Sequence, residues 1–74
     1  MTYQVLDTIV LDRDLLAHRL RKGDVGAVVD VYENDGLEVE FVTASGSTAA
    51  LLTLNVRDVR LPAADDLVSV RTRR

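Results

Sequence analysis

The chain has 74 residues, close to the lower limit for a self-sufficient core, and we interpret it as one domain. It contains no cysteine, which excludes disulfides, zinc–thiolate sites and thiol nucleophiles and favours a reducing compartment. The formal net charge is −3, and neither a signal peptide nor an apolar run of membrane-spanning length stands out. We therefore expect a cytoplasmic protein without a membrane segment. For a chain this short, self-association or partner binding would add stability.

The first half of the chain begins with an apolar run over residues 5–11, which predicts a strand with apolar residues on both faces. Residues 12–22 follow as a long loop with one helical turn, because this stretch is too short for a stable helix. We expect three leucines to hold the loop on the core: Leu15, Leu16 and Leu20. Gly23 and Asp24 then form a turn signal, since glycine reaches positive φ without strain.

Residues 25–32 alternate with a period of two, which predicts a second strand with one buried face. The two sets are Val25, Ala27, Val29 and Val31 on one side and Gly26, Val28, Asp30 and Tyr32 on the other. Gly26 stands one step into the strand, where a bulge or a close backbone approach is expected. Glu33–Gly36 closes a hairpin, with the Asp35-Gly36 pair as its turn signal.

The second half predicts three more strands. Leu37, Val39 and Phe41 alternate with Glu38, Glu40 and Val42, which predicts a strand with one face inward. The remaining elements are a turn over 43–47, a strand over 48–54 with Ala50, Leu52 and Leu54 inward, a 3₁₀ turn over 55–58 and a closing strand over 59–61 that Pro62 ends.

Taken together, these elements predict an all-β fold, a small five-stranded antiparallel SH3-like barrel with a long first loop, over residues 1–62. Residues 63–74 form a C-terminal tail outside this pattern, docked or disordered. Two secondary structures are compatible with this tail: a short helix capped at 65–66, or an edge strand over 67–70. Its apolar residues have no assigned place, and docking on the barrel or on a second protomer would cover them.

Charge is segregated along the chain. Every charged residue of segment 24–40 is acidic, whereas segment 13–22 is basic with one exception, Asp14. One interpretation is ordinary solvated surface. The other is a bipolar surface that steers a protein partner or a second copy. The residues that we assign to this surface are Arg13, His18, Arg19, Arg21, Lys22, Asp30, Glu33 and Asp35.

Candidate catalytic chemistry is sparse. His18 is the only histidine, and none of the serines that would complete a triad, Ser45, Ser47 and Ser69, lies in a nucleophile-elbow motif. One histidine and scattered carboxylates give no metal-ligand spacing, and no phosphate-binding loop follows Gly23. We therefore expect no enzyme activity, no metal and no cofactor.

The corner Gly23-Asp24-Val25-Gly26-Ala27-Val28-Val29 resembles that of KOW-like and other SH3-like barrels. The chain up to Pro62 is similar to a family of short bacterial proteins, a domain of unknown function with that fold. The matching segments are Leu6-Asp7-Thr8-Ile9-Val10, Leu20 to Gly26, Val39 to Val42, Leu51 to Leu54 and Asp58-Val59-Arg60. This resemblance implies a fold and no catalytic residues, and such barrels occur as accessory, partner-binding or antitoxin-like pieces.

Two functions follow as hypotheses. The first is a non-catalytic protein-interaction module, an accessory or antitoxin-like subunit that binds a protein partner or itself. The alternative is a KOW-type RNA-binding domain that uses the basic loop 13–22. Against RNA stand the acidic total and the few aromatic residues for base stacking, Tyr3, Tyr32 and Phe41.

Overall fold

The computed structural model of this chain describes residues 2–42 and 48–64. The expected turn over 43–47 and the tail from residue 65 onward lie outside the described residues. The elements are β1 (Thr8–Leu11), η1 (Leu16–His18), β2 (Val25–Val31), β3 (Gly36–Val42), β4 (Thr48–Asn55), η2 (Val56–Asp58) and β5 (Val59–Arg60), where η marks a 3₁₀ turn.

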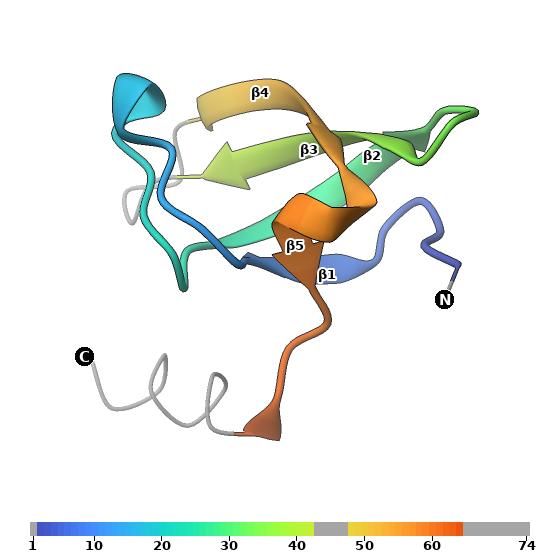
Figure 1. Ribbon diagram of the computed structural model, residues 1–74, viewed down its shortest axis with the longest axis horizontal. Coiled ribbons are helices and arrows are strands. Elements are labelled where there is room, and N and C mark those ends of the chain that lie inside the picture. Colours follow the sequence, from blue (N-terminus) through green and yellow to red (C-terminus); the bar gives the residue numbers. More distant parts are fainter. Residues whose placement is uncertain (1, 43–47, 65–74) are drawn as a thin grey trace.

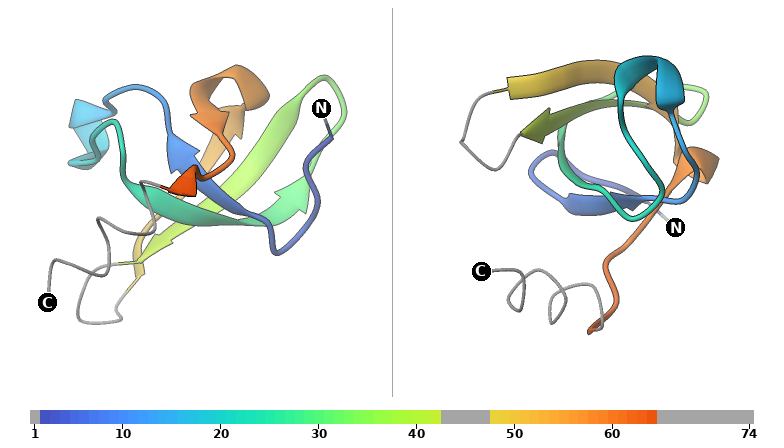
Figure 2. Two further views of the ribbon diagram at one scale, coloured as in Figure 1. Left: turned by 90° about the horizontal axis from the view of Figure 1, so that it is seen from below. Right: turned by 90° about the vertical axis from the view of Figure 1, so that its left-hand side faces the viewer.

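The five strands form one antiparallel sheet in the order β4-β3-β2-β1-β5. The sheet curls strongly, so that β5 and β1 face β3 and β4 across the core (Figures 1 and 2). The predicted all-β, five-stranded SH3-like barrel with a long first loop is therefore confirmed. The curl encloses an apolar interior even though the chain is short.

The core lies inside the curl and is built from alternate residues of each strand. Leu37, Val39 and Phe41 of β3 are at most 2% exposed, as their alternation with polar residues predicts. Ala50, Leu52 and Leu54 of β4 pack against the core and are partly buried. The other buried members of the cluster are Tyr3, Ile9, Leu11, Leu15, Leu20, Val28 and Val59.

A bulge in β2 divides the valine set that the sequence places on one face. Val28 pairs with Val39 inside the curl, and the register then shifts between Val28 and Asp30. Because of this extra residue, Asp30 pairs with Glu38 outside and Val31 pairs with Leu37 inside. The buried face of β2 thus holds Gly26 and Val28, and the expectation of one continuous valine face is wrong.

Gly26 itself is a site of close approach rather than the bulge. A Cβ at this position would lie 2.8 Å from Phe41 Cε1 and 2.9 Å from the Glu40 carbonyl oxygen. Of the two outcomes expected for Gly26, the close approach is therefore confirmed.

The first strand is shorter than predicted, because residues 4–7 form a turn. Asp7 Oδ2 accepts the Gln4 N–H at 2.9 Å, and the Gln4 carbonyl accepts the Asp7 N–H at 3.0 Å. Leu6 has φ of 79° and is 83% exposed. The local turn competes successfully with strand pairing, so β1 begins only at Thr8.

The loop between β1 and β2 contains the expected single helical turn, η1. Leu15 and Leu20 form an isolated bridge and are buried, so they hold the loop on the core as predicted. Leu16 is 68% exposed, and its predicted anchoring role is wrong, because η1 turns its side chain outward. Gly23 has φ of 98°, which confirms the predicted turn there.

The predicted β2–β3 hairpin is present, and the residues with positive φ in its turn are Asn34 and Asp35. Asn34 and Asp35 have φ of 62° and 65°, while Gly36 is the first residue of β3. Asn and Asp tolerate this left-handed region better than other residues with a side chain. The predicted hairpin is therefore confirmed.

The expected 3₁₀ turn before the last strand is η2, and Asn55 precedes it as the cap. Asn55 Oδ1 accepts the Arg57 N–H at 2.9 Å, and Asp58 Oδ2 accepts the Asn55 N–H at 3.0 Å. This reciprocal pair is a capping box, which satisfies N–H groups that the turn leaves unpaired. It directs the chain from β4 across the barrel into β5.

Candidate functional site

The residues predicted to form one bipolar surface lie at two ends of the molecule. Arg13, His18, Arg19, Arg21 and Lys22 are in the β1–β2 loop, and Asp30, Glu33 and Asp35 are at the β2–β3 hairpin. Strand β2 leads from the loop to the hairpin, and its first five residues, roughly 17 Å of extended chain, precede Asp30. Figure 1 and the left view of Figure 2 both show the loop and the hairpin tip at opposite ends of the molecule. The fold does not bring the two groups together.

The basic loop carries carboxylates among its cations. Asp14 Oδ1 accepts the Lys22 N–H at 2.8 Å, and Asp24 Oδ2 accepts the Arg21 N–H at 2.8 Å. Arg13 Nη1 lies 3.6 Å from Asp58 Oδ1 at the end of η2. These carboxylates lie beside the cations and offset part of their charge.

The four remaining predicted residues of the loop are exposed: His18, Arg19, Arg21 and Lys22. Within the described ranges their side chains form no ion pair. Arg19 has φ of 59° directly after η1, and its N–H donates to the Leu16 carbonyl. The loop therefore exposes these cations without a carboxylate partner among the described residues.

The hairpin end carries the opposite charge. Asp30, Glu33 and Asp35 are exposed, and none of them is in an ion pair with another described residue. Asp30 Oδ1 accepts the neighbouring Val31 N–H at 2.8 Å, and the Asp35 carbonyl accepts the Val56 N–H at 2.9 Å. The second bond ties the hairpin tip to η2. We call these three carboxylates the acidic hairpin end.

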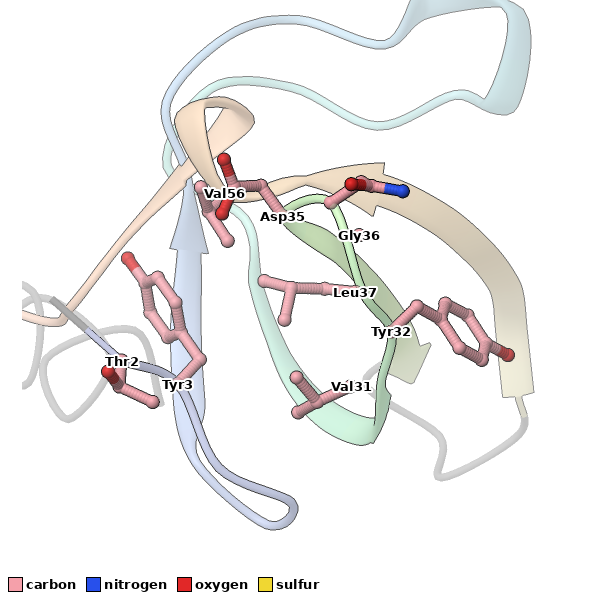
Figure 3. Close-up of a pocket in the computed structure, with 9 residues that line it drawn as sticks. Thr2, Tyr3, Val31, Tyr32, Asp35, Gly36, Leu37 and Val56 are labelled. Carbon is pink, nitrogen blue, oxygen red and sulfur yellow. The ribbon is translucent and has the colours of Figure 1, made fainter.

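A shallow pocket of about 200 Å³ opens beside the acidic hairpin end. Its residues come from the N-terminal segment, the hairpin and η2: Thr2, Tyr3, Val31, Tyr32, Asn34, Asp35, Gly36, Leu37 and Val56. Figure 3 shows the side chains of Tyr3, Val31, Leu37 and Val56 around the pocket, with the Asp35 carboxylate near Val56. The β2 bulge is what turns Val31 inward to this wall. We call this the hairpin pocket.

Tyr32 belongs to a separate polar group on the outer face of the sheet. Figure 3 shows its ring directed away from Tyr3 and Leu37. Thr53 Oγ1 donates to Glu38 Oε1 at 2.7 Å, and the Tyr32 hydroxyl lies 3.4 Å from the same oxygen. Desolvation, followed by the nearby carboxylates of Glu38 and Asp30, raises the pKa of Tyr32 above its ordinary value of 10.0.

Sequence reasoning identified Asp35 of the hairpin pocket but missed its apolar wall. Tyr3, Leu37 and Val56 are far apart in the chain and come together only when β3 and η2 curl over the N-terminal segment. No local sequence pattern indicates that these three residues lie close together in the fold. The one available signal was Tyr3, an aromatic residue outside every predicted element.

Of the histidine and serine residues weighed for catalysis, only His18 lies in the described part of the chain. His18 is exposed in η1, and Ser45, Ser47 and Ser69 lie outside the described residues. Across residues 2–42 and 48–64 no three His, Asp or Glu side chains are grouped as metal ligands. In the same part of the chain, no helix has the length and apolar character needed to cross a membrane.

The structure is thus a small curled β-barrel domain with a shallow pocket of aliphatic and polar residues at one end. The family described as "Domain of unknown function (DUF4926)" matches residues 5–61, which is most of the chain, and the protein belongs to this family. The match spans the barrel from the turn before β1 to the residue after β5. No curated protein and no solved structure matches the chain.

Proposed function

We propose that this chain is a non-catalytic interaction module that binds a protein partner through the acidic hairpin end and the hairpin pocket. The observation that carries the proposal is their adjacency. A shallow pocket with both aliphatic and polar lining residues lies at the hairpin tip, where Glu33 and Asp35 are exposed carboxylates with no ion pair within the described part of the chain. Apolar anchoring surrounded by one sign of charge is a common arrangement for recognising a complementary partner segment.

The size and charge of the site specify the partner's chemistry. At about 200 Å³ the pocket is smaller than the 300–1,000 Å³ typical of small-molecule sites, and it is open at the surface. It suits one aliphatic or aromatic side chain of a protein. Asp35, which lines the pocket, and Glu33 in the same hairpin turn favour lysine or arginine residues beside that anchor.

We infer that such a module serves as an accessory or antitoxin-like subunit of a bacterial, cytoplasmic complex. The support is the resemblance of the Gly23–Val29 corner to KOW-like and other SH3-like barrels, which is an analogy of fold rather than of site.

A second candidate, KOW-type RNA binding, depends on the other end of the molecule. The exposed Arg19, Arg21 and Lys22 favour it, because unpaired cations on a loop contact phosphates. The interleaved carboxylates of Asp14 and Asp24 disfavour it, since they repel a polyanion at the same surface.

Fluorescence anisotropy with defined probes tests the two candidates. The probes are labelled decapeptides with a central leucine and either lysine or glutamate flanks, and a labelled mixed-sequence RNA. The first variant is Glu33→Gln with Asp35→Asn, which removes charge while Asn preserves the left-handed backbone at position 35. The matched control, at the opposite end, is Arg19→Gln with Arg21→Gln.

We expect the lysine-flanked peptide to bind, with affinity that decreases as salt increases. The hairpin variant should lose at least about tenfold in affinity, while the loop variant should bind as the unmodified protein does. Failure of every lysine-flanked peptide to bind, or equal binding by the hairpin variant, contradicts the proposal. RNA binding that the loop variant abolishes establishes the second candidate instead.

A further inference from the structure

The two edges of the sheet are unequal. β5 is two residues long and Pro62, which has no N–H to donate, follows shortly after it. β4 is eight residues long, and in the described part of the chain it pairs with β3 alone. Short strands, prolines and charged residues protect sheet edges from pairing with other chains. Thr48–Asn55 has no proline and no charged residue, so β4 is the unprotected edge.

The apolar interior is also least covered along β4. The inward residues of the three inner strands, such as Ile9, Val28 and Val39, are fully buried. By contrast, all three inward residues of β4 are only partly buried: Ala50, Leu52 and Leu54. On the outer face Leu51 is 56% exposed. Figure 1 shows β4 as the last strand on its side of the sheet, with no described strand beyond it.

We propose that β4 pairs in antiparallel fashion with β4 of a second copy, which joins the two sheets into one across a two-fold axis. A free strand edge presents backbone N–H and C=O groups that an added strand satisfies. The same strand covers Leu51 and the partly exposed inward leucines of β4. Two-fold pairing presents the same surface from both copies, so one strand provides both halves of the interface.

Charge is compatible with a second copy as the occupant, and the side-chain pattern of β4 is self-complementary. The outer faces of β2 and β3 carry Asp30, Glu38 and Glu40, in a chain of net charge −3, whereas β4 has no ionisable residue. Two copies meet along β4 without opposing like charges across the new ladder.

The register follows from the side-chain pattern. A two-fold axis at Leu51 places the Leu51 side chains of both copies opposite each other on the outer face, and Ala50 opposite Leu52 on the inner face. Glu40 pairs with Leu51 within each copy. The two Glu40 residues are then three strand spacings apart, roughly 14 Å, which exceeds the screening length of about 8 Å at physiological salt. Their repulsion does not oppose this pairing.

Light scattering over a concentration series tests the proposal with the full chain. Leu51→Lys and Leu51→Glu each place like charges opposite each other across the axis. The matched control is Val25→Lys, which adds the same charge on the outer face of β2, at a residue that is 40% exposed and two strands from the edge. We expect dimers for the unmodified protein and for Val25→Lys, and at least about tenfold weaker association for either Leu51 variant. An equimolar mixture of Leu51→Lys and Leu51→Glu should form a heterodimer, detected by native mass spectrometry.

A chain that is monomeric up to about 1 mM overturns the proposal, as does a Leu51→Lys dimer of unchanged affinity. A mixture that stays monomeric rejects the axis at Leu51. If both Leu51 variants unfold, hydrogen exchange of the unmodified protein tests the dimer instead. The β4 amides should exchange more slowly as the protein concentration rises. Exchange rates that do not depend on concentration reject the dimer. The surface is distinct from the hairpin pocket, so Glu33→Gln with Asp35→Asn should dimerise normally.

Discussion

Gly26 lies directly opposite Phe41 in the β2–β3 ladder, and the Phe41 ring occupies the space that a side chain at position 26 would need. Phe41 is 2% exposed and is the largest of the fully buried side chains in the described part of the chain, so its ring has little room to move. The absence of a side chain at Gly26 is what allows the Phe41 ring to lie this close to the β2 backbone.

Gly26→Ala should therefore destabilise the protein by about 2 kcal/mol, the usual cost of overfilling a packed interior. Urea unfolding followed by circular dichroism measures the change. Gly36→Ala is the matched control, because its added Cβ would meet Tyr32 Cβ at 3.3 Å at the edge of the hairpin, and we expect a smaller loss. Equal stability of Gly26→Ala and the unmodified protein would contradict the packing described here.

Leu20 anchors the β1–β2 loop on the core whereas Leu16 in the same loop is exposed, so the same truncation at the two positions should have unequal effects. Leu20→Ala removes a buried side chain and should cost about 2–3 kcal/mol. Leu16→Ala removes an exposed one and should change stability by less than about 0.5 kcal/mol. Thermal and urea unfolding of both variants measure the difference. Similar losses of stability for the two variants would contradict the anchoring of the loop by Leu20 rather than Leu16.

Asp58 has two roles whose contributions should differ in size. Its Oδ2 caps η2 through the Asn55 N–H, and its Oδ1 lies near Arg13, whose side chain is largely exposed. Asp58→Ala should cost about 1 kcal/mol through the lost cap, whereas Arg13→Gln should cost less than about 0.5 kcal/mol, because exposed ion pairs contribute little. Denaturant unfolding of both variants at low and high salt separates the contribution of the cap from that of the ion pair, because only the ion pair is screened by salt. A large, salt-sensitive loss in Arg13→Gln would reverse this assignment.

The environment of Tyr32 predicts a shift in its titration. In a Tyr3→Phe background, the tyrosinate absorbance reports Tyr32 alone, and its pKa should lie above 10.0. Glu38→Gln should lower that pKa, because it removes a neighbouring negative charge and weakens the hydroxyl's acceptor. A midpoint at or below 10.0, or one that Glu38→Gln leaves unchanged, would contradict the geometry around Glu38.

The same shift has a consequence for stability. Above pH 10 the unfolded chain loses the tyrosine proton before the folded protein does, so the unfolded state binds fewer protons. The contribution of Tyr32 to stability is therefore fully present below pH 10 and decreases as pH rises through the folded-state pKa. Urea midpoints measured from pH 8 upward should decrease less steeply in Tyr32→Phe than in the unmodified protein.

The sequence alone was sufficient to predict that there are five strands and where each lies approximately along the chain. Leu37, Val39 and Phe41 alternate with polar residues, and Gly23 supplies a positive φ, so local patterns determine β3 and the turn before β2. These features depend on residues that are neighbours in the chain. The same holds for η2, whose cap and capped residues are three positions apart.

Only the tertiary structure decided where the functional candidates meet. The bulge after Val28 turned Val31 inward, and the curl of the sheet brought Tyr3 and Val56 to the same pocket wall. It also placed Arg19 and Asp35, both expected on one surface, at opposite ends of β2. A bulge shifts every later side chain to the other face, and curling joins residues that no local spacing connects, so neither could be derived from periodicity.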